Sequence, residues 1–207
     1  MDTIQLLGST LGLGLLAGIR LYATVLVLGL AIRFHLFHLS TQMSHLSVLA
    51  DTRVLIAAGI AAGLEFFSDK IPWVDSVWDS VHTFIRPVGA ALLGATALGD
   101  TDPVTKFVVV LLCGGVALTG HSTKAATRLM ANHSPEPFSN IGLSFFEDLI
   151  VPAGVWIAVK HPLVAFGIVL AFLAAFAWLA PKIYRAVRTE WTTVSDFFRK
   201  RSARVHT

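Results

Sequence analysis

The run from Leu163 to Leu179, LVAFGIVLAFLAAFAWL, most narrows what this chain can fold into, because it contains no charged residue. About 20 apolar residues in a helix cross the ~30 Å hydrocarbon core of a bilayer. Only 14% of the 207 residues are charged, whereas a soluble domain carries about 25%. The sequence therefore predicts an all-α polytopic transmembrane bundle, and a soluble helical domain is the disfavoured alternative.

The apolar runs predict about six membrane segments. The first is longer than one straight span requires. Three interpretations of it stay open: a tilted helix, a helix broken near Gly18-Ile19-Arg20, and a re-entrant pair of half-helices. We expect the third segment to begin at Pro87, because the residues before it are polar. The expected segments are residues 4–34, 52–67, 87–99, 104–120, 141–160 and 163–179.

A charged stretch, EFFSDKIPWVDSVWDSVHTFIRP, lies between two of these segments, from Glu65 to Pro87. Pro72 ends or kinks the helix that carries Lys70. Helical spacing after Pro72 puts four polar residues on one face and apolar residues on the other. The polar face holds Asp75, Asp79, His82 and Arg86, opposite Val74, Val77, Trp78, Val81 and Ile85.

A second polar stretch runs from His121 to Pro152. His121, Lys124 and Arg128 share one helical face, and PEPFSN forms a turn. Glu147 and Asp148 fall inside the expected fifth segment. The candidates for binding a substrate or an ion are Arg20, Glu65, Asp69, Lys70, Asp75, Asp79, His82, Arg86, His121, Lys124, Arg128, Glu136, Asn140, Glu147 and Asp148.

Ionisable residues within a membrane are functional candidates, because burying a charge is costly unless it pairs or meets water. The structural alternative is a set of ion pairs that tie helices together, for example Asp79 with Arg86 or Lys124 with Glu147. Asp75, Asp79 and His82 are weak candidates for a metal, and no cofactor is expected. His35, His38 and His45 favour an interfacial connection over a metal site, and Cys113 allows no disulfide within one chain.

An internal echo pairs HTFIRPVGA (82–90) with EDLIVPAGV (147–155), which matches Pro87 with Pro152 and Gly89 with Gly154. The sequence thus predicts a membrane domain over 1–181, with parallel repeat halves at about 52–99 and 104–160. The remainder, 182–207, is predicted to be a basic amphipathic helix in the headgroup region, anchored by Tyr184, Trp191, Phe197 and Phe198 and bound to anionic lipid.

The positive-inside rule predicts the orientation. Lys70, Arg86, Lys124, Arg128 and the basic tail share one side, and the other side holds Arg33, Arg53, Lys106 and Lys160. We therefore expect a protein of the cytoplasmic membrane with both polar stretches and its C-terminus on the cytoplasmic side. The N-terminus lies on the same side unless the first run is re-entrant, in which case it moves and the tail stays.

Four strings of this chain resemble one known family: GIRLYATV, EFFSDKIPWVDSVWDSVHTFIRPVGAALL, GHSTKAATR and SPEPFSNIGLSFFED. They are similar to the bacterial integral-membrane family catalogued as domain of unknown function 4126, from about Gly14 to Ala158. The resemblance implies membrane residence and the importance of these strings, and it supplies no chemistry.

Three functions stay open. The first is an oligomeric transporter or channel for an ion or a small anionic solute, without enzyme activity, which predicts a wet cavity facing Glu65 or Glu147. The second is a non-catalytic scaffold or assembly factor, which predicts that the same charges are paired and dry. The third is a membrane-embedded metal enzyme, which requires several of Asp69, Asp75, Asp79, His82 and Glu136 to converge. Nucleic acid is not an expected partner.

Overall fold

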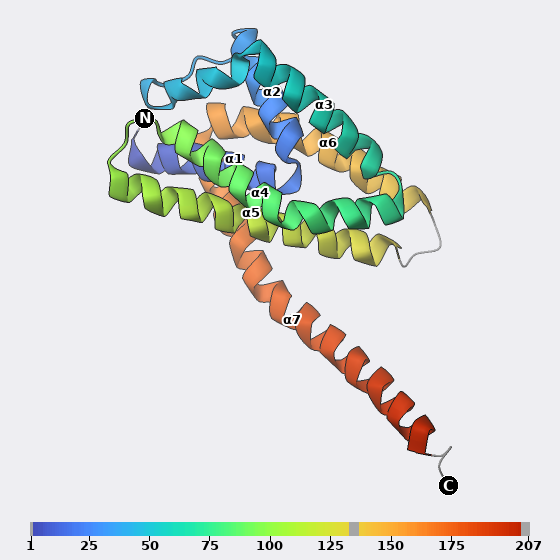
Figure 1. The fold of residues 1–207 in the computed structure, drawn as a ribbon. Helices are drawn as coiled ribbons and strands as arrows, with labels where there is room; N and C mark the ends of the chain where they lie inside the picture. The colour runs from blue at the N-terminus through green and yellow to red at the C-terminus, as the bar shows by residue number, and fades with distance from the viewer. Residues whose placement is uncertain (1, 133–136, 204–207) are drawn as a thin grey trace. The chain divides into compact units, whose positions relative to one another are not determined.

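The computed structural model describes the backbone of residues 2–132 and 137–203. Within these ranges it describes all side chains except those of residues 72, 73, 76, 129–132, 137–140 and 183–203. The described backbone is helical and contains no strand, which confirms the predicted all-α class. The elements are α1 (Thr3–Ile19), α2 (Leu21–Arg33), the 3₁₀ helix η1 (Thr41–Ala50), α3 (Thr52–Ser68), α4 (Pro72–Leu98), α5 (Pro103–Asn132), α6 (Pro137–Lys160) and α7 (Pro162–Ala203) (Figure 1).

Residues up to Leu170 form one compact unit, and the chain from Ala171 onward forms a second. The second unit is the continuation of α7, which stays helical through Pro181 to Ala203. The anchors Tyr184, Trp191, Phe197 and Phe198 lie outside the described side chains, so their predicted role remains a prediction.

Four of the described helices are long and apolar enough to cross a membrane, and η1 with α3, bent by 70°, makes a fifth if they count as one span. The predicted total of about six is not reached, because α1 and α2 are each shorter than a span. The four spans are Val77–Leu98, Pro103–Arg128, Ile141–Lys160 and Pro162–Lys182.

The expected start of the third segment at Pro87 is wrong, because Pro87 lies inside α4 and the apolar window already begins at Val77. A membrane helix tolerates an internal proline when its neighbours compensate for the missing hydrogen bond. The residues from Val77 to Pro87 belong to this candidate span despite their charge, because their polar face turns inward. Val77, Phe84 and Val88 point outward and are more than half exposed, whereas Asp79 and Arg86 are buried.

The first apolar run is broken at Arg20, whose backbone is extended (φ −146°, ψ 92°). From its start, α1 runs alongside α5 in the same direction: Gly14 lies against Cys113, and Gly18 against Ala117. At Gly18 the backbone approach leaves no room for a β-carbon, which would lie 2.3 Å from the Ala117 carbonyl oxygen. Glycine therefore lets α1 sit inside the bundle, where most of its residues are buried.

After Arg20, α2 returns in the opposite direction. Its last turns lie against the start of α3, because Gly29 contacts the Leu49 backbone and Arg33 donates hydrogen bonds to Ala50 O and Thr52 Oγ1. The start of α1 lies at the same end of the bundle, since Gly8 contacts Pro162 at the beginning of α7. Of the three interpretations left open by the sequence, the re-entrant pair with its break at Arg20 fits these contacts.

The bundle of residues 2–170 thus has two ends. At the Gly99 end lie η1, the α4–α5 turn and the α6–α7 junction: His45 reaches Asp100, and the Phe37 ring packs on Trp156. At the Asp69 end, α3 stops and α4 begins, α5 stops and α6 begins (Figure 1). Because α4 and α6 both start at the Asp69 end, these two helices run in the same direction through the bundle. The internal repeat remains a prediction.

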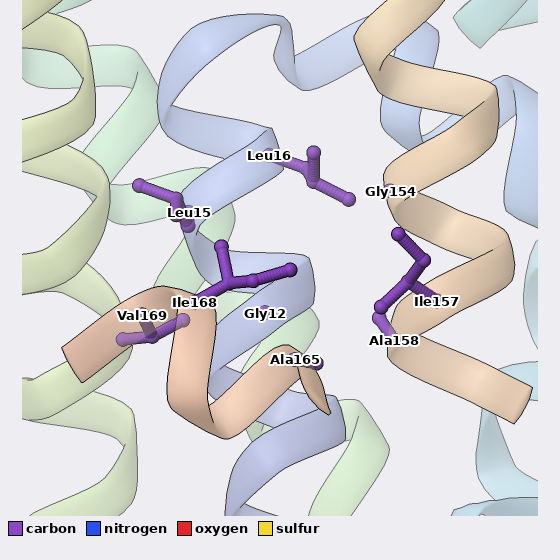
Figure 2. Close-up of a pocket in the computed structure, with 9 residues that line it drawn as sticks. All are labelled: Gly12, Leu15, Leu16, Gly154, Ile157, Ala158, Ala165, Ile168 and Val169. Atoms are coloured by element: carbon purple, nitrogen blue, oxygen red, sulfur yellow. The ribbon is translucent and has the colours of Figure 1, made fainter. Parts of the chain in front are cut away.

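A small apolar cavity of about 50 Å³ lies where α1 meets α6 and the first turns of α7 (Figure 2). Its lining includes Gly12, Leu16 and Ile168, and none of the charged candidates. A cavity of this character stays dry. It is a packing gap between helices, not a site for a polar ligand.

Candidate functional site

Arg20, at the break between α1 and α2, is the centre of a buried group of charges. Its guanidinium lies 2.6 Å from Asp69 Oδ2, 3.0 Å from Asp148 Oδ1 and 3.5 Å from Glu147 Oε2. It also donates a hydrogen bond to Ser144 Oγ at 3.0 Å. The tip of the re-entrant pair is thereby tied to the end of α3 and to α6.

Two cations of α5 share the same carboxylates. Lys124 Nζ lies 3.2 Å from Asp69 and 3.3 Å from Glu147, and Arg128 donates to Glu147 Oε2 at 3.0 Å. Burial raises the pKa of the Asp69 carboxyl, but Lys124, Arg20 and Arg128 outweigh this effect and hold the pKa below its ordinary value. Three cations therefore face three carboxylates, and the pairing of Lys124 with Glu147 expected from the sequence is confirmed.

A second group of charges surrounds Arg86. This guanidinium is 0% exposed and lies 2.8 Å from Glu65 Oε1 and 3.3 Å from Asp79 Oδ1. The expected pairing of Asp79 with Arg86 is therefore confirmed. Arg86 follows Val77, the first residue of its span, by about 14 Å of helix rise. If this candidate span crosses a ~30 Å hydrocarbon core, Arg86 lies near its midplane.

The two histidines extend this second group. Arg86 Nη1 donates to His121 Nδ1 at 2.6 Å, and His121 Nε2 donates to the Asp79 carbonyl at 3.0 Å. Since Nδ1 accepts a hydrogen bond from a guanidinium, the His121 imidazole is neutral. His82 stacks on Trp78 and meets the Tyr22 hydroxyl at 3.2 Å. We call these two groups of charged and polar side chains the polar network.

Lys70 and Asp75 lie beside the polar network at the Asp69 end. Lys70 Nζ lies over the Phe66 ring and donates to Phe66 O and to Ser144 Oγ, and burial lowers its pKa. Asp75 is buried, yet its Oδ1 has no hydrogen-bond partner. Thirteen of the fifteen candidates thus fall in or beside the network, whereas Glu136 and the Asn140 side chain lie outside the described residues.

Three polar residues of the network are absent from the sequence-based candidates: Tyr22, Thr83 and Ser144. Ser144 could have been selected from the sequence. It aligns with the candidate Asp79 in the internal repeat that aligns His82 with Glu147. Thr83 forms a hydrogen bond with His121 at 3.0 Å. A single threonine within a helical pattern does not predict such a contact between helices. Tyr22 follows the helix break by two residues and could be suspected only once that break was known.

Within the part of the chain that the structure describes, no three His, Cys, Asp or Glu side chains are arranged to hold a metal ion. Asp75, Asp79 and His82 share a helical face, but Asp79 is engaged by Arg86 and His82 by Tyr22 and Trp78. The network instead brings together cations and carboxylates in near balance. Such a set can bind a small charged solute by exchanging internal ion pairs for external ones.

A groove of about 570 Å³ runs over α2, α3 and α4 on the outside of the bundle. Its walls are mostly apolar, with Ala57, Ala58 and Ala61 from α3, and Arg53 stands at its Gly99 end. Tyr22 also lines the groove. Because the same tyrosine meets His82, it joins the outer surface of the helices to the polar network.

Residues 7–182 match the family model described as domain of unknown function (DUF4126), and the chain belongs to this family. The resemblance found in the four sequence strings is thereby confirmed. No curated protein and no solved structure is detectably similar to the chain.

Proposed function

We propose that this DUF4126 member is a small transporter or channel of the bacterial cytoplasmic membrane, which moves an ion or a small anionic solute without converting it chemically. The supporting observation is the placement of Arg20 at the tip of a re-entrant helix pair, bonded to carboxylates of two other segments. Discontinuous helices whose broken ends meet charged groups are a recurrent feature of transporter sites.

The energetics favour a working role for the polar network over a purely structural one. Buried ion pairs add little stability compared with apolar packing, because desolvation offsets most of their attraction. Ten ionisable side chains are nevertheless buried together: Arg20, Glu65, Asp69, Asp75, Asp79, His82, Arg86, His121, Lys124 and Arg128. In our proposal the described arrangement is the closed state, and an anionic solute competes with Asp69 and Glu147 for the three cations around them.

A second candidate function, a non-catalytic scaffold or assembly factor, is favoured by one observation. Glu65 and Arg86 are both 0% exposed and pair with each other at 2.8 Å, as a dry structural contact would. In that case the basic tail, 182–207, carries the function by binding a partner or anionic lipid. We also propose homo-oligomers for either function, and a cytoplasmic Asp69 end from the distribution of Lys and Arg.

The deciding experiment is solute flux into vesicles that contain the purified full-length chain. Internal pyranine reports H⁺, and radiolabelled sodium and orthophosphate report a cation and an anion. We expect at least one probe to enter at least ten times faster than into protein-free vesicles. Glu65→Gln should remove this flux, because the neutral amide cannot pair with Arg86.

Asp102→Asn serves as the matched control. Asp102 is an exposed carboxylate at the Gly99 end that caps the backbone N–H groups of Val104 and Thr105, and asparagine caps equally well. Its flux should equal that of the wild type. If every probe enters at the protein-free rate although the protein is folded, the transporter proposal fails and the scaffold candidate stands.

A further inference from the structure

Asp75 differs from the other buried carboxylates of the network. Asp69, Asp79 and Glu65 each form an ion pair with Lys or Arg, whereas no ion pair or side-chain hydrogen bond joins Asp75 to another described residue. Asp75 as a whole is only 1% exposed. A buried carboxyl group without a partner is much more costly when ionised than when it holds a proton.

The charges around Asp75 come from three segments. Asp79 follows it by one turn on α4, Asp69 lies just beyond α3, and Arg128 and Lys124 come from α5. Burial, followed by the negative charge of Asp79, raises the pKa of Asp75 to about 7, although Arg128 and Lys124 oppose this rise. Asp75 precedes Val77, the first residue of the α4 span, and so stands where the network meets the Asp69 end.

We infer that the Asp75 carboxyl group is a proton-binding site at the Asp69 end of the polar network, and that H⁺ is the coupling ion of transport. The coupling part of this inference rests on the proposed function. Release converts the carboxylic acid to a carboxylate, and the proton passes to water at the Asp69 end. Loss of the proton adds a negative charge one turn from Asp79, which repels Asp79 and weakens its hold on Arg86.

Infrared difference spectra of the full-length chain in lipid vesicles test the proton site directly, without any solute. Between about pH 5 and pH 9 we expect the wild type to lose a protonated-carboxyl band in the C=O stretching region. Asp75→Asn should lack this change, and Asp102→Asn should keep it, because hydrogen bonds from Thr105 hold the pKa of Asp102 below its ordinary value. An identical band change in wild type and Asp75→Asn would overturn the proton site.

Flux in the same vesicles tests the coupling. With a pH gradient imposed, we expect wild-type uptake of the transported probe to change at least fivefold, and uptake by Asp75→Asn to be independent of the gradient. An equal response in both proteins would overturn H⁺ as the coupling ion. If the wild type transports no probe, the proposed function and the proton coupling both fail. The infrared result still decides whether Asp75 binds a proton.

Discussion

Arg86 shows how strongly single residues of the network depend on each other. Its guanidinium has no exposure and is held by Glu65, Asp79 and His121. Removing one partner of a buried ion pair leaves the other charge uncompensated, at a cost of about 3 to 5 kcal/mol. The network therefore behaves as a unit in which a single deletion is worse than a matched double deletion.

We predict that Arg86→Met lowers the free energy of unfolding by about 3 kcal/mol or more, and that adding Glu65→Gln recovers part of the loss. The recovery follows because the double variant no longer buries an unpaired Glu65 carboxylate. Unfolding in mixed micelles, followed as a function of detergent composition, measures the free energy of unfolding of the single and the double variant. Strictly additive losses would show that Glu65 and Arg86 do not interact.

The stability of the protein should also depend on pH through Asp75. Its pKa is raised in the fold, from 3.8 to about 7, so the folded state holds the proton more tightly than the unfolded state. The stabilising contribution is complete below about pH 4 and is lost as the pH rises through about 7. We predict that the melting temperature of Asp75→Asn, relative to wild type, increases by several degrees from pH 5 to pH 8. A difference in melting temperature that stays constant between pH 5 and pH 8 would contradict the raised pKa of Asp75.

For single residues, the sequence predicts the ion pairs that follow from helical spacing and misses those that depend on tertiary contacts. Asp79 with Arg86 was expected because both lie on one face of one helix. Arg20 with Asp69 was not, since no periodicity relates residues on either side of an unrecognised hairpin. Asp75 was grouped correctly with its helical face. That its Oδ1 has no hydrogen-bond partner among the described residues depends on tertiary contacts, which helical spacing does not predict.

Among the elements, α1 depends most on close backbone packing. A β-carbon at Gly18 would lie 2.3 Å from Ala117 O, whereas one at Gly63 in α3 meets nothing within 4 Å. We predict that Gly18→Ala costs about 1 to 3 kcal/mol through overpacking. Gly63→Ala, the matched control, should be neutral or stabilising by up to about 1 kcal/mol, because alanine is the better helix former. Equal melting temperatures for the two variants would contradict the central position of α1.

Element boundaries were predictable only where composition and burial agree. The helix that follows the predicted break at Pro72 is present as expected. The α4 span was placed too late because its polar residues suggested a surface, although a charged face can cross a membrane when it points inward. The break at Arg20 was among the expected alternatives, but only contacts with α3, α5 and α7 distinguish a returning hairpin from a straight crossing.

For the whole molecule, the re-entrant pair changes the predicted topology. Because α1 starts and α2 ends at the Gly99 end, the N-terminus should lie opposite the Asp69 end, which we propose to be cytoplasmic. In a Cys113→Ala background, cysteines at Asp2 and Thr101 should react with a membrane-impermeant maleimide in intact cells. A cysteine at Ile71, in the turn between α3 and α4 at the Asp69 end, should react only after lysis. Labelling of Thr101→Cys without Asp2→Cys would contradict the hairpin.

The same hairpin has a consequence for how the chain is made. In the order of the chain α1 is synthesised before its packing partners α5, α6 and the first turns of α7. Neither α1 nor α2 is long enough to be retained as a span, and Arg20 between them opposes retention further. We therefore expect the hairpin to take its place only after the later helices have been inserted, although it precedes them in the chain.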